Sequence, residues 1–131
     1  MTNAFRILIA DDDDDDVFFF RQAISEMNVA CHVESFQNGS LLLDHLSSSK
    51  TLPSLIILDL NMPRMNGFEV LEKLKEDERL KPIPAYILTT SQNESDIKKC
   101  TELGSDGFYT KPLEYSGYTT IIENILTRVT F

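Results

Sequence analysis

The chain has 131 residues, 42% of them hydrophobic, and a formal net charge of −9. This composition is typical of one globular domain with its own core, and the acidic excess argues against direct nucleic-acid binding, because phosphate backbones would be repelled. No apolar run is long enough to cross a membrane, so we expect a cytoplasmic protein.

The first predicted element is a short buried strand, residues 6–10, and six consecutive aspartates follow it at 11–16. The residues after them have the spacing of a helix that buries one apolar stripe. Phe18 lies outside that stripe, where it is either an ordinary surface aromatic or a contact for a partner. The stripe consists of Phe19, Phe20, Ala23, Ile24 and Met27.

Two further strands are predicted before the middle of the chain. Residues 32–36 alternate weakly between apolar and polar, which indicates a strand at the edge of a sheet, and Asn38 then begins a leucine-rich helix. The apolar run at 55–58 has no alternation, which is typical of a strand buried on both faces of a parallel sheet. Asp59 follows directly, and Pro63 cannot continue a strand, so Asp59 is expected at the strand's end.

The second half of the chain continues the alternation. We expect a helix from Phe68 to about Leu80, a strand at 85–89, a helix at 96–103 with Asn93 or Ser95 as N-cap and Gly104 as C-cap, a strand at 107–110, and a last helix at about 114–128. Five strands alternating with five helices predict an α/β fold, a doubly wound parallel sheet covered on both faces. Ligands bind such sheets outside the carboxyl ends of the strands.

Four of the five predicted strands end in groups suited to a phosphoryl ligand, namely Asp11 with Asp12, Asp59, Thr89 and Lys111. Crowded carboxylates repel one another, and a divalent cation removes this conflict. Mg²⁺ prefers oxygen ligands, so we assign it to Asp11, Asp12, Asp59 and the backbone carbonyl of Asn61. Lys111 and Thr89 would bind the phosphoryl oxygens, and Asp59 would be the nucleophile.

These strand ends belong to four motifs: Asp11-Asp12 after an apolar strand, Leu58-Asp59-Leu60-Asn61-Met62-Pro63 with Asn66-Gly67, Thr89-Thr90-Ser91, and Gly104-x-x-Gly107-Phe108-x-x-Lys111-Pro112. In order and spacing, from about Ile7 to the end of the chain, they closely resemble the receiver domain of bacterial two-component response regulators. The resemblance implies a single, stand-alone receiver domain over 1–131, similar to chemotaxis regulators. It also implies the flavodoxin-like (βα)5 fold with strand order 2-1-3-4-5.

The resemblance further implies what the site residues do. A sensor histidine kinase or a phosphotransfer protein would phosphorylate Asp59, Mg²⁺ would be bound by Asp59 with the acid pair at 11–12, and Thr89 and Lys111 would contact the phosphoryl group. The protein would catalyse only its own phosphorylation and dephosphorylation, and it would relay the group or bind a downstream protein target. We expect no DNA-binding effector domain, so the chain is either a complete single-domain protein or an excised fragment.

A conformational switch is also implied by the resemblance. Thr89 would be drawn to the phosphoryl group, Phe108 would turn inward, and the face formed by residues 96–103, 107–110 and 114–128 would change shape. Many family members have Tyr where this chain has Phe108, so here packing alone must carry the signal. A cis peptide bond between Lys111 and Pro112 is expected on the same grounds.

Two other functions fit these residues less well. A Mg²⁺-dependent phosphatase with an aspartate nucleophile would need an acid-base Asp two residues after the nucleophile, and this position is Asn61, which cannot transfer the proton. A degenerate interaction module, folded but unable to accept a phosphoryl group, is disfavoured by the complete set of acid pair, Thr89 and Lys111.

The remaining aspartates, 13–16, are interpreted as a solvated first helical turn, which the helix dipole favours, although Asp12 or Asp13 could share the metal. A calcium-binding loop is rejected, because position 16 is Asp instead of Gly and Gln22 stands where such a loop needs a bidentate Glu.

No zinc site is expected. Cys31, Cys100, His32 and His45 lack the spacing of zinc ligands, and the cysteines are expected to be buried free thiols. Neither histidine has an acidic partner that the sequence identifies.

Overall fold

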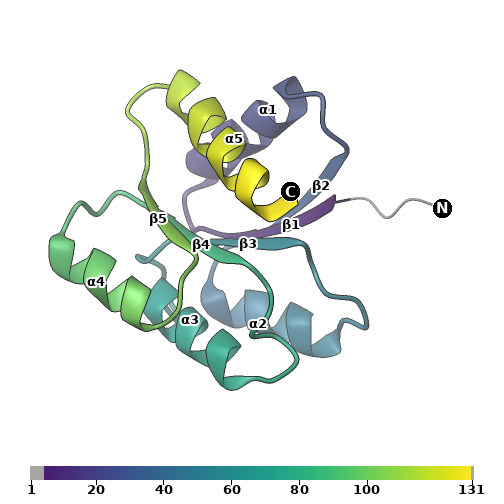
Figure 1. Ribbon diagram of the computed structural model, residues 1–131, viewed down its shortest axis with the longest axis vertical. Helices are drawn as coiled ribbons and strands as arrows, with labels where there is room; N and C mark the ends of the chain where they lie inside the picture. The colour runs from purple at the N-terminus through teal and green to yellow at the C-terminus, as the bar shows by residue number, and fades with distance from the viewer. Residues whose placement is uncertain (1–4, 131) are drawn as a thin grey trace.

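The computed structural model describes residues 5–130 and contains a five-stranded parallel sheet (Figure 1). The strands are β1 (Phe5–Ala10), β2 (Cys31–Phe36), β3 (Leu55–Leu58), β4 (Ala85–Thr89) and β5 (Gly107–Thr110). They pair in the order β2-β1-β3-β4-β5. The predicted flavodoxin-like fold and strand order are therefore confirmed, and β2 is an edge strand as expected.

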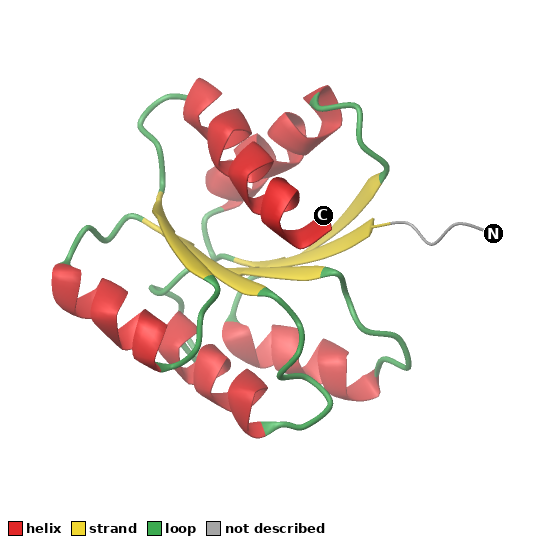
Figure 2. Ribbon diagram, in the orientation of Figure 1, coloured by secondary structure: helices red, strands yellow, loops and turns green. Residues whose placement is uncertain are grey.

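The five helices form two layers, one on each face of the sheet. They are α1 (Asp14–Glu26), α2 (Gly39–Ser48), α3 (Gly67–Glu76), α4 (Glu94–Glu102) and α5 (Ser116–Thr130). Helices α1 and α5 cover one face, and α2, α3 and α4 cover the other (Figures 1 and 2). Among residues 5–130, no helix is both long and apolar enough to cross a membrane.

The sheet is buried between these layers, as the uninterrupted apolar run of β3 predicts. Ile56 and Leu58 pack into the core cluster under α2, α3 and α4, whereas Leu55 and Ile57 pack into the cluster under α1 and α5. All four side chains are no more than 1% exposed. Burial of each stabilises the fold by about 1.5–3 kcal/mol, so this short strand belongs to both cores.

Four helices begin with an Asp or Asn side chain that accepts a backbone N–H of the first turn. These N-caps are Asp13, Asn38, Asn66 and Asn93. Asn66 forms a complete capping box, because the Glu69 side chain in turn accepts the N–H of Asn66. The expected start at Asn38 is confirmed, and of the two candidates for α4 the structure selects Asn93. Gly104 follows α4 with φ +96°, a left-handed conformation that suits glycine.

Helix boundaries differ from the prediction in α3, α4 and α5, and α4 begins at Glu94, two residues earlier than expected. Helix α3 ends at Glu76 instead of near Leu80, because Asp77 is extended and its carboxylate accepts the N–H groups of Arg79 (2.8 Å) and Leu80 (3.3 Å). Leu80 is still buried, which explains why the apolar pattern misled the prediction. Helix α5 begins at Ser116, two residues later than expected.

The apolar stripe of α1 is only partly as predicted. Phe20, Ala23 and Ile24 are buried, but Phe19 is 38% exposed and Val17 is buried in its place. The Phe19 ring lies against α5, with its centroid 6.1 Å from that of Tyr118. The neighbouring Phe18 is 59% exposed, so both interpretations of this residue remain open.

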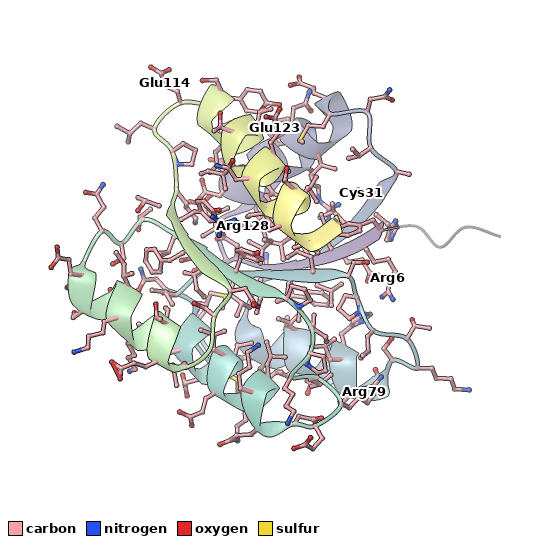
Figure 3. The ribbon with its side chains drawn as sticks, in the orientation of Figure 1. Arg6, Cys31, Arg79, Glu114, Glu123 and Arg128 are labelled. Atoms are coloured by element: carbon pink, nitrogen blue, oxygen red, sulfur yellow. The ribbon has the colours of Figure 1, made fainter. Side chains whose placement is uncertain are left out.

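Both cysteines are free thiols, as expected, but only Cys100 is fully buried. Cys31 is half-buried at the start of β2 (Figure 3). Burial raises the pKa of the Cys100 thiol to about 11, and it also raises the pKa of Cys31. Both thiols therefore stay protonated near neutral pH and are poor nucleophiles.

Candidate functional site

The predicted strand ends meet at one edge of the sheet. The N–H of Asp11 bonds to the carbonyl of Phe36 (2.9 Å), and the N–H of Asp59 bonds to that of Ala10 (3.0 Å). The backbone hydrogen bonds of the strands thus continue one residue into the site and fix the backbone positions of Asp11 and Asp59. Asp11 and Asp59 are only 3% and 5% exposed, whereas Asp12 is exposed. The sheet therefore holds two buried carboxylates and one solvated carboxylate together at this edge.

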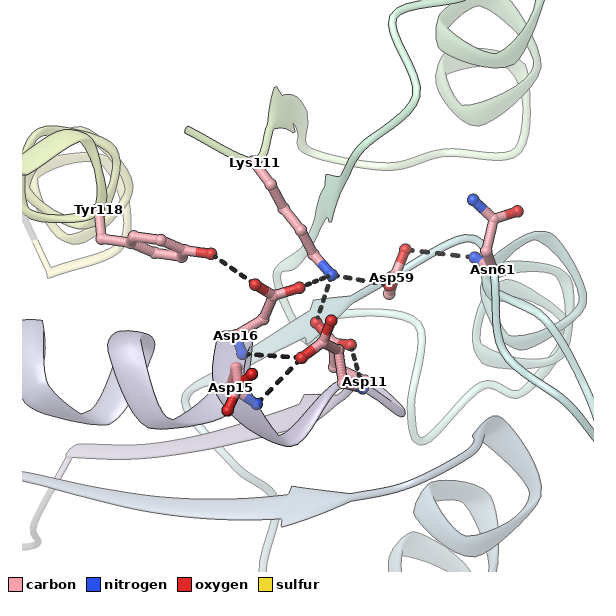
Figure 4. A network of polar contacts seen from close by, with 8 residues as sticks. Asp11, Asp15, Asp16, Asp59, Asn61, Lys111 and Tyr118 are labelled. Carbon is pink, nitrogen blue, oxygen red and sulfur yellow. Dashed lines mark hydrogen bonds and ion pairs between the residues drawn. The ribbon is translucent and has the colours of Figure 1, made fainter. Parts of the chain in front are cut away.

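Lys111 is the cation at the centre of this cluster (Figure 4). It follows β5, and its Nζ lies 2.9 Å from Asp11 Oδ2, 3.0 Å from Asp59 Oδ2 and 2.6 Å from Asp16 Oδ2. Lys111 donates hydrogen bonds to Asp16 and Asp59, and it forms an ion pair with Asp11. The Lys111 side chain is 6% exposed, and water screens these ion pairs little.

Asp16 is a member of the cluster that the sequence analysis missed. It lies in the first turn of α1, where we expected solvated acids, yet its Oδ2 contacts Lys111 and its Oδ1 accepts the Tyr118 hydroxyl at 3.2 Å. A signal was present, because Asp16 precedes the buried Phe20 by four residues and so lies on the core-facing side of the helix. A carboxylate at that position needs a partner.

Asp13 has a different role from Asp16. Its carboxylate accepts the N–H groups of Asp15 and Asp16 as the N-cap of α1, and its own N–H donates to Asp11 Oδ1 at 2.9 Å. The sequence left open whether Asp13 also binds the metal. Metal binding would compete with the capping role of the same carboxylate.

The three predicted acidic metal ligands can reach one ion. One carboxylate oxygen from each of Asp11, Asp12 and Asp59 lies within 4.8 Å of the others, and such a set can hold a divalent metal. Burial raises the pKa of Asp11 from 3.8 to about 7, against the lowering effect of its bonds to Lys111 and to the Asp13 N–H. The site therefore carries negative charge that one lysine does not fully compensate. The N–H of Asn61 bonds to Asp59 Oδ1 at 3.2 Å, and its carbonyl remains a predicted ligand.

Lys111 stays charged in this environment. Burial alone would lower its pKa, but the hydrogen bonds to Asp16, Asp11 and Asp59, together with the Asp11 charge, outweigh burial and hold the pKa above its ordinary value. A permanent ammonium group next to Asp59 is suited to bind an anionic group that arrives there.

Thr89, at the end of β4, has a buried and unpartnered hydroxyl. The residue is 0% exposed, and its Oγ1 has no hydrogen-bond partner among residues 5–130. Leaving such a group unpaired costs about 1–3 kcal/mol. Phe108 on β5 is half-buried and pairs with Ile87, which places it on the same face of the sheet as Thr89. Thr89 and Phe108, the predicted switch residues, therefore lie on the same face of the sheet, and the Thr89 hydroxyl has no acceptor there among the described residues.

The loop after Asp59 depends on a glycine. A Cβ atom at Gly67 would lie 2.5 Å from the carbonyl oxygen of Asp59, so only glycine fits, and the Gly67 N–H bonds to the carbonyl of Leu60 at 3.2 Å. Arg64 and Met65 in the same loop have left-handed backbones, with φ of 52° and 96°. The Asn66-Gly67 motif thus places α3 directly against the backbone of Asp59.

Two expectations are corrected by the structure. Residues 5–130 contain no cis peptide bond, so the predicted cis bond between Lys111 and Pro112 is wrong. The trans form is the ordinary preference, and Lys111 reaches Asp59 with it. The histidines do have an acidic neighbour, since the Nε2 atoms of His32 and His45 each lie 3.9 Å from a carboxylate oxygen of Glu34.

Comparisons with known proteins agree with this geometry. The model of the response regulator receiver domain matches residues 7–123. The probable methanogenesis regulatory protein FilR2 of Methanothrix harundinacea is 29% identical over 125 residues, covering 92% of this chain and 81% of that protein. The two-component response regulator ORR5 of Oryza sativa is 35% identical over 94 residues, covering 72% of this chain and 69% of ORR5.

Solved structures show the same architecture. The phosphorylated cyanobacterial phytochrome response regulator RcpA superposes with a TM-score of 0.90 at 29% identity, covering 98% of this chain and 95% of RcpA. The Mn²⁺-bound form of the response regulator Rcp1 gives a TM-score of 0.84 at 28% identity, covering 93% of this chain and 91% of Rcp1. The likeness extends over nearly the whole of each chain.

Proposed function

The chain belongs to the response regulator receiver domain family of two-component signalling, and from this premise we propose that residues 1–131 form one receiver domain that is switched by phosphorylation of Asp59. One observation supports this choice above others. Asp59 is buried at a strand end, with Lys111 Nζ 3.0 Å from one oxygen and two further carboxylates within metal-ligand reach. A buried aspartate with these neighbours is suited to be a phosphoacceptor.

The proposed reaction transfers a phosphoryl group from a phosphohistidine to Asp59. A carboxylate oxygen of Asp59 forms the O–P bond while the P–N bond to the donor imidazole breaks, and the imidazole keeps that electron pair. Lys111 and the unpartnered Thr89 hydroxyl donate hydrogen bonds to the phosphoryl oxygens. These groups position the phosphoryl group and stabilise its charge, which are the main contributions that a protein makes to phosphoryl transfer.

Mg²⁺ is the proposed cofactor. Asp11, Asp12 and Asp59 would hold it with the backbone carbonyl of Asn61, and the fit rests on the three carboxylate oxygens that lie within 4.8 Å of one another. When bound, Mg²⁺ neutralises charge between these carboxylates and the phosphoryl oxygens. The buried Asp11, whose pKa is raised, would lose its proton to become a ligand.

The proposed output is a change in the surface formed by α4, β5 and α5. Thr89 would move toward the phosphoryl oxygens, and Phe108, half-buried on the same layer, would follow into the vacated space. The proposed partners are a sensor histidine kinase or phosphotransfer protein and a downstream protein target. We propose a cytoplasmic location, with no direct contact to nucleic acid or membrane.

Incubation with acetyl phosphate and Mg²⁺, followed by intact-mass analysis, tests this function. We expect one added phosphoryl group on the wild type and none on Asp59→Asn, which keeps the size of the side chain but lacks the nucleophilic charge. The same protein should not turn over p-nitrophenyl phosphate, in contrast to an aspartate-nucleophile phosphatase. Labelling of Asp59→Asn to the wild-type extent would refute the assignment of the acceptor.

A further inference from the structure

We infer that Asp16 is a positioning residue of the phosphoacceptor site, which holds Lys111 in place and connects it to Tyr118 on α5. This inference rests on the proposed function, because it concerns how the Lys111 ammonium is presented to a phosphoryl group on Asp59. The contact between Lys111 Nζ and Asp16 Oδ2, at 2.6 Å, is the shortest that Lys111 makes in the site. The Asp16 side chain is 22% exposed and reaches inward from the first turn of α1.

The three carboxylates around Lys111 differ in what phosphorylation does to them. A divalent cation would draw on the oxygens of Asp11, and Asp59 would become an acyl phosphate, which accepts hydrogen bonds more weakly than a carboxylate. Asp16 has neither role in the proposed reaction. It is therefore the one carboxylate partner of Lys111 that stays available throughout, and it fixes Nζ while the other two partners change.

Asp16 also extends the polar contacts of the site to a second helix. Its other oxygen accepts the Tyr118 hydroxyl at 3.2 Å, and Tyr118 is 3% exposed within the core cluster under α1 and α5 (Figure 4). An unbroken series of polar contacts thus runs from Asp59 through Lys111 and Asp16 to α5. When Asp59 and Asp11 bind Lys111 less strongly, the fixed ammonium interacts more strongly with Asp16, and Asp16 becomes a weaker acceptor for the Tyr118 hydroxyl.

A second tyrosine pair on the same two helices provides the comparison. The Tyr115 hydroxyl donates to Glu26 Oε1 at 2.7 Å, so it also joins α5 to α1 through a carboxylate. Glu26, at the last turn of α1, is exposed and contacts no residue of the site among those described. Both tyrosine–carboxylate pairs join α5 to α1, but only the Tyr118 pair includes a partner of Lys111.

The first test measures the rate of labelling by acetyl phosphate at saturating Mg²⁺. Asp16→Asn should label roughly tenfold more slowly than wild type, the effect of losing one hydrogen bond to a charged group. Tyr118→Phe should slow labelling by about threefold, as expected for one neutral donor. The slowing should appear in the maximal rate and leave the half-saturating acetyl phosphate concentration unchanged, because Asp16 does not touch that substrate.

Two matched controls separate this role from general effects. Asp15→Asn removes the same charge from the same helical turn, and Asp15 is exposed, so its labelling rate should equal that of the wild type. Tyr115→Phe removes the corresponding hydroxyl outside the site and should also label normally. Equal rates for Asp16→Asn and Asp15→Asn would overturn the inference.

The second test follows Tyr118 directly by fluorine NMR of protein that contains fluorotyrosine. The chain has four tyrosines, and the signals of Tyr118 and Tyr115 are assigned by their Phe variants. On phosphorylation the Tyr118 signal should shift in the wild type and not in Asp16→Asn, while the Tyr115 signal stays in place in both. A Tyr118 signal that does not respond in labelled wild-type protein would also overturn the inference.

The outcomes distinguish this inference from the proposed function. If the wild type accepts no phosphoryl group, the proposed function is wrong and the role of Asp16 fails with it. If the wild type is labelled and Asp16→Asn is labelled equally fast, only the inference is wrong. Circular dichroism and urea unfolding check that Asp16→Asn is folded, and if it is not, Tyr118→Phe decides the question from the other side of the same hydrogen bond.

Discussion

The two ends of the sheet differ in chemistry although the same strands form both. At the carboxyl end, β3 runs into the buried Asp59, next to Asp11 and the unpartnered Thr89. At the amino end, β3 begins with Leu55, which is 1% exposed, and the nearby starts of β1 and β2 border a mostly apolar cavity of about 420 Å³. That cavity is lined by Phe5, Met27, Val29, Ala30, Cys31, Glu123, Leu126 and Thr127.

The fold therefore places its stabilising apolar contacts and its reactive groups at opposite ends of the strands. The amino end gains stability from burial of apolar side chains, whereas the carboxyl end crowds like charges that oppose folding. Substitutions at the amino end should therefore affect stability alone, whereas substitutions at the carboxyl end should also affect labelling, and the following predictions test this difference.

The largest effect is expected for Lys111→Met. This change removes the cation that three carboxylates share, so without Mg²⁺ it should destabilise the fold by about 3–5 kcal/mol, the usual result of leaving buried charges unpaired. Labelling by acetyl phosphate should fall on the order of a hundredfold. Urea unfolding and intact-mass kinetics measure the two effects. Lys98→Met, at an exposed position on α4, should leave both unchanged.

Leu55→Ala should have the next largest effect, on stability alone. Truncation of a buried leucine leaves a cavity and should cost about 2–5 kcal/mol in the free energy of unfolding. Because Leu55 lies at the amino end of β3, the labelling rate per folded molecule should match the wild type at a temperature where the variant is folded. A variant that is fully folded but labels slowly would show that the two ends are coupled.

Gly67→Ala should affect both measurements, since Gly67 lies against the Asp59 backbone. The added Cβ would be 2.5 Å from the Asp59 carbonyl oxygen, so the loop or the start of α3 must shift. We expect a loss of about 1–3 kcal/mol in unfolding free energy, as for other overpacked sites, together with slower labelling. Normal labelling in this variant would show that the position of α3 does not matter to the acceptor.

The last expected effect is a dependence of stability on pH that originates at the carboxyl end. The pKa of Asp11 is raised from 3.8 to about 7, mainly by burial, so between these values the folded chain holds a proton that the unfolded chain has lost. Its stabilising contribution is complete below about pH 4 and is lost as the pH rises through 7. In metal-free urea unfolding, Asp11→Asn should remove this decline. Added Mg²⁺ should oppose it in the wild type, because the metal binds the deprotonated form.

Most of the fold follows from local sequence patterns. The apolar run of β3 and the caps at Asn38 and Asn66 depend on neighbours in the chain, and together with the alternation of strands and helices they predict a parallel sheet covered on both faces. The strand order was implied by the resemblance to receiver domains. The same topology brings Asp11, Asp59 and Lys111 to one edge, so most of the site could also be predicted. What the patterns could not give were features set by tertiary packing, such as the end of α3 at Glu76.

Asp16 is the clearest example of a site residue that local sequence patterns could not predict. Five other aspartates directly precede it in the sequence, and local rules assign the acids of a first helical turn to solvent. Its role depends on Lys111, which is 95 residues away, and on the orientation of α1 against α5. The 3.9 Å distance from His45 to Glu34 has the same cause, since it requires β2 and α2 to be placed side by side.

The capped helix ends also shape the electrostatic field around the acceptor. In this topology each of the four capped helices begins at the sheet edge where the carboxylates gather, so the partial positive ends of several helix dipoles face that edge. The potential there is less negative than the count of aspartates indicates, most of all beside Asp12, which lies two residues before α1 begins. An approaching phosphate donor therefore meets oriented backbone dipoles that need no reorganisation, and these dipoles lower the barrier that a chain of net charge −9 would otherwise present to an anion.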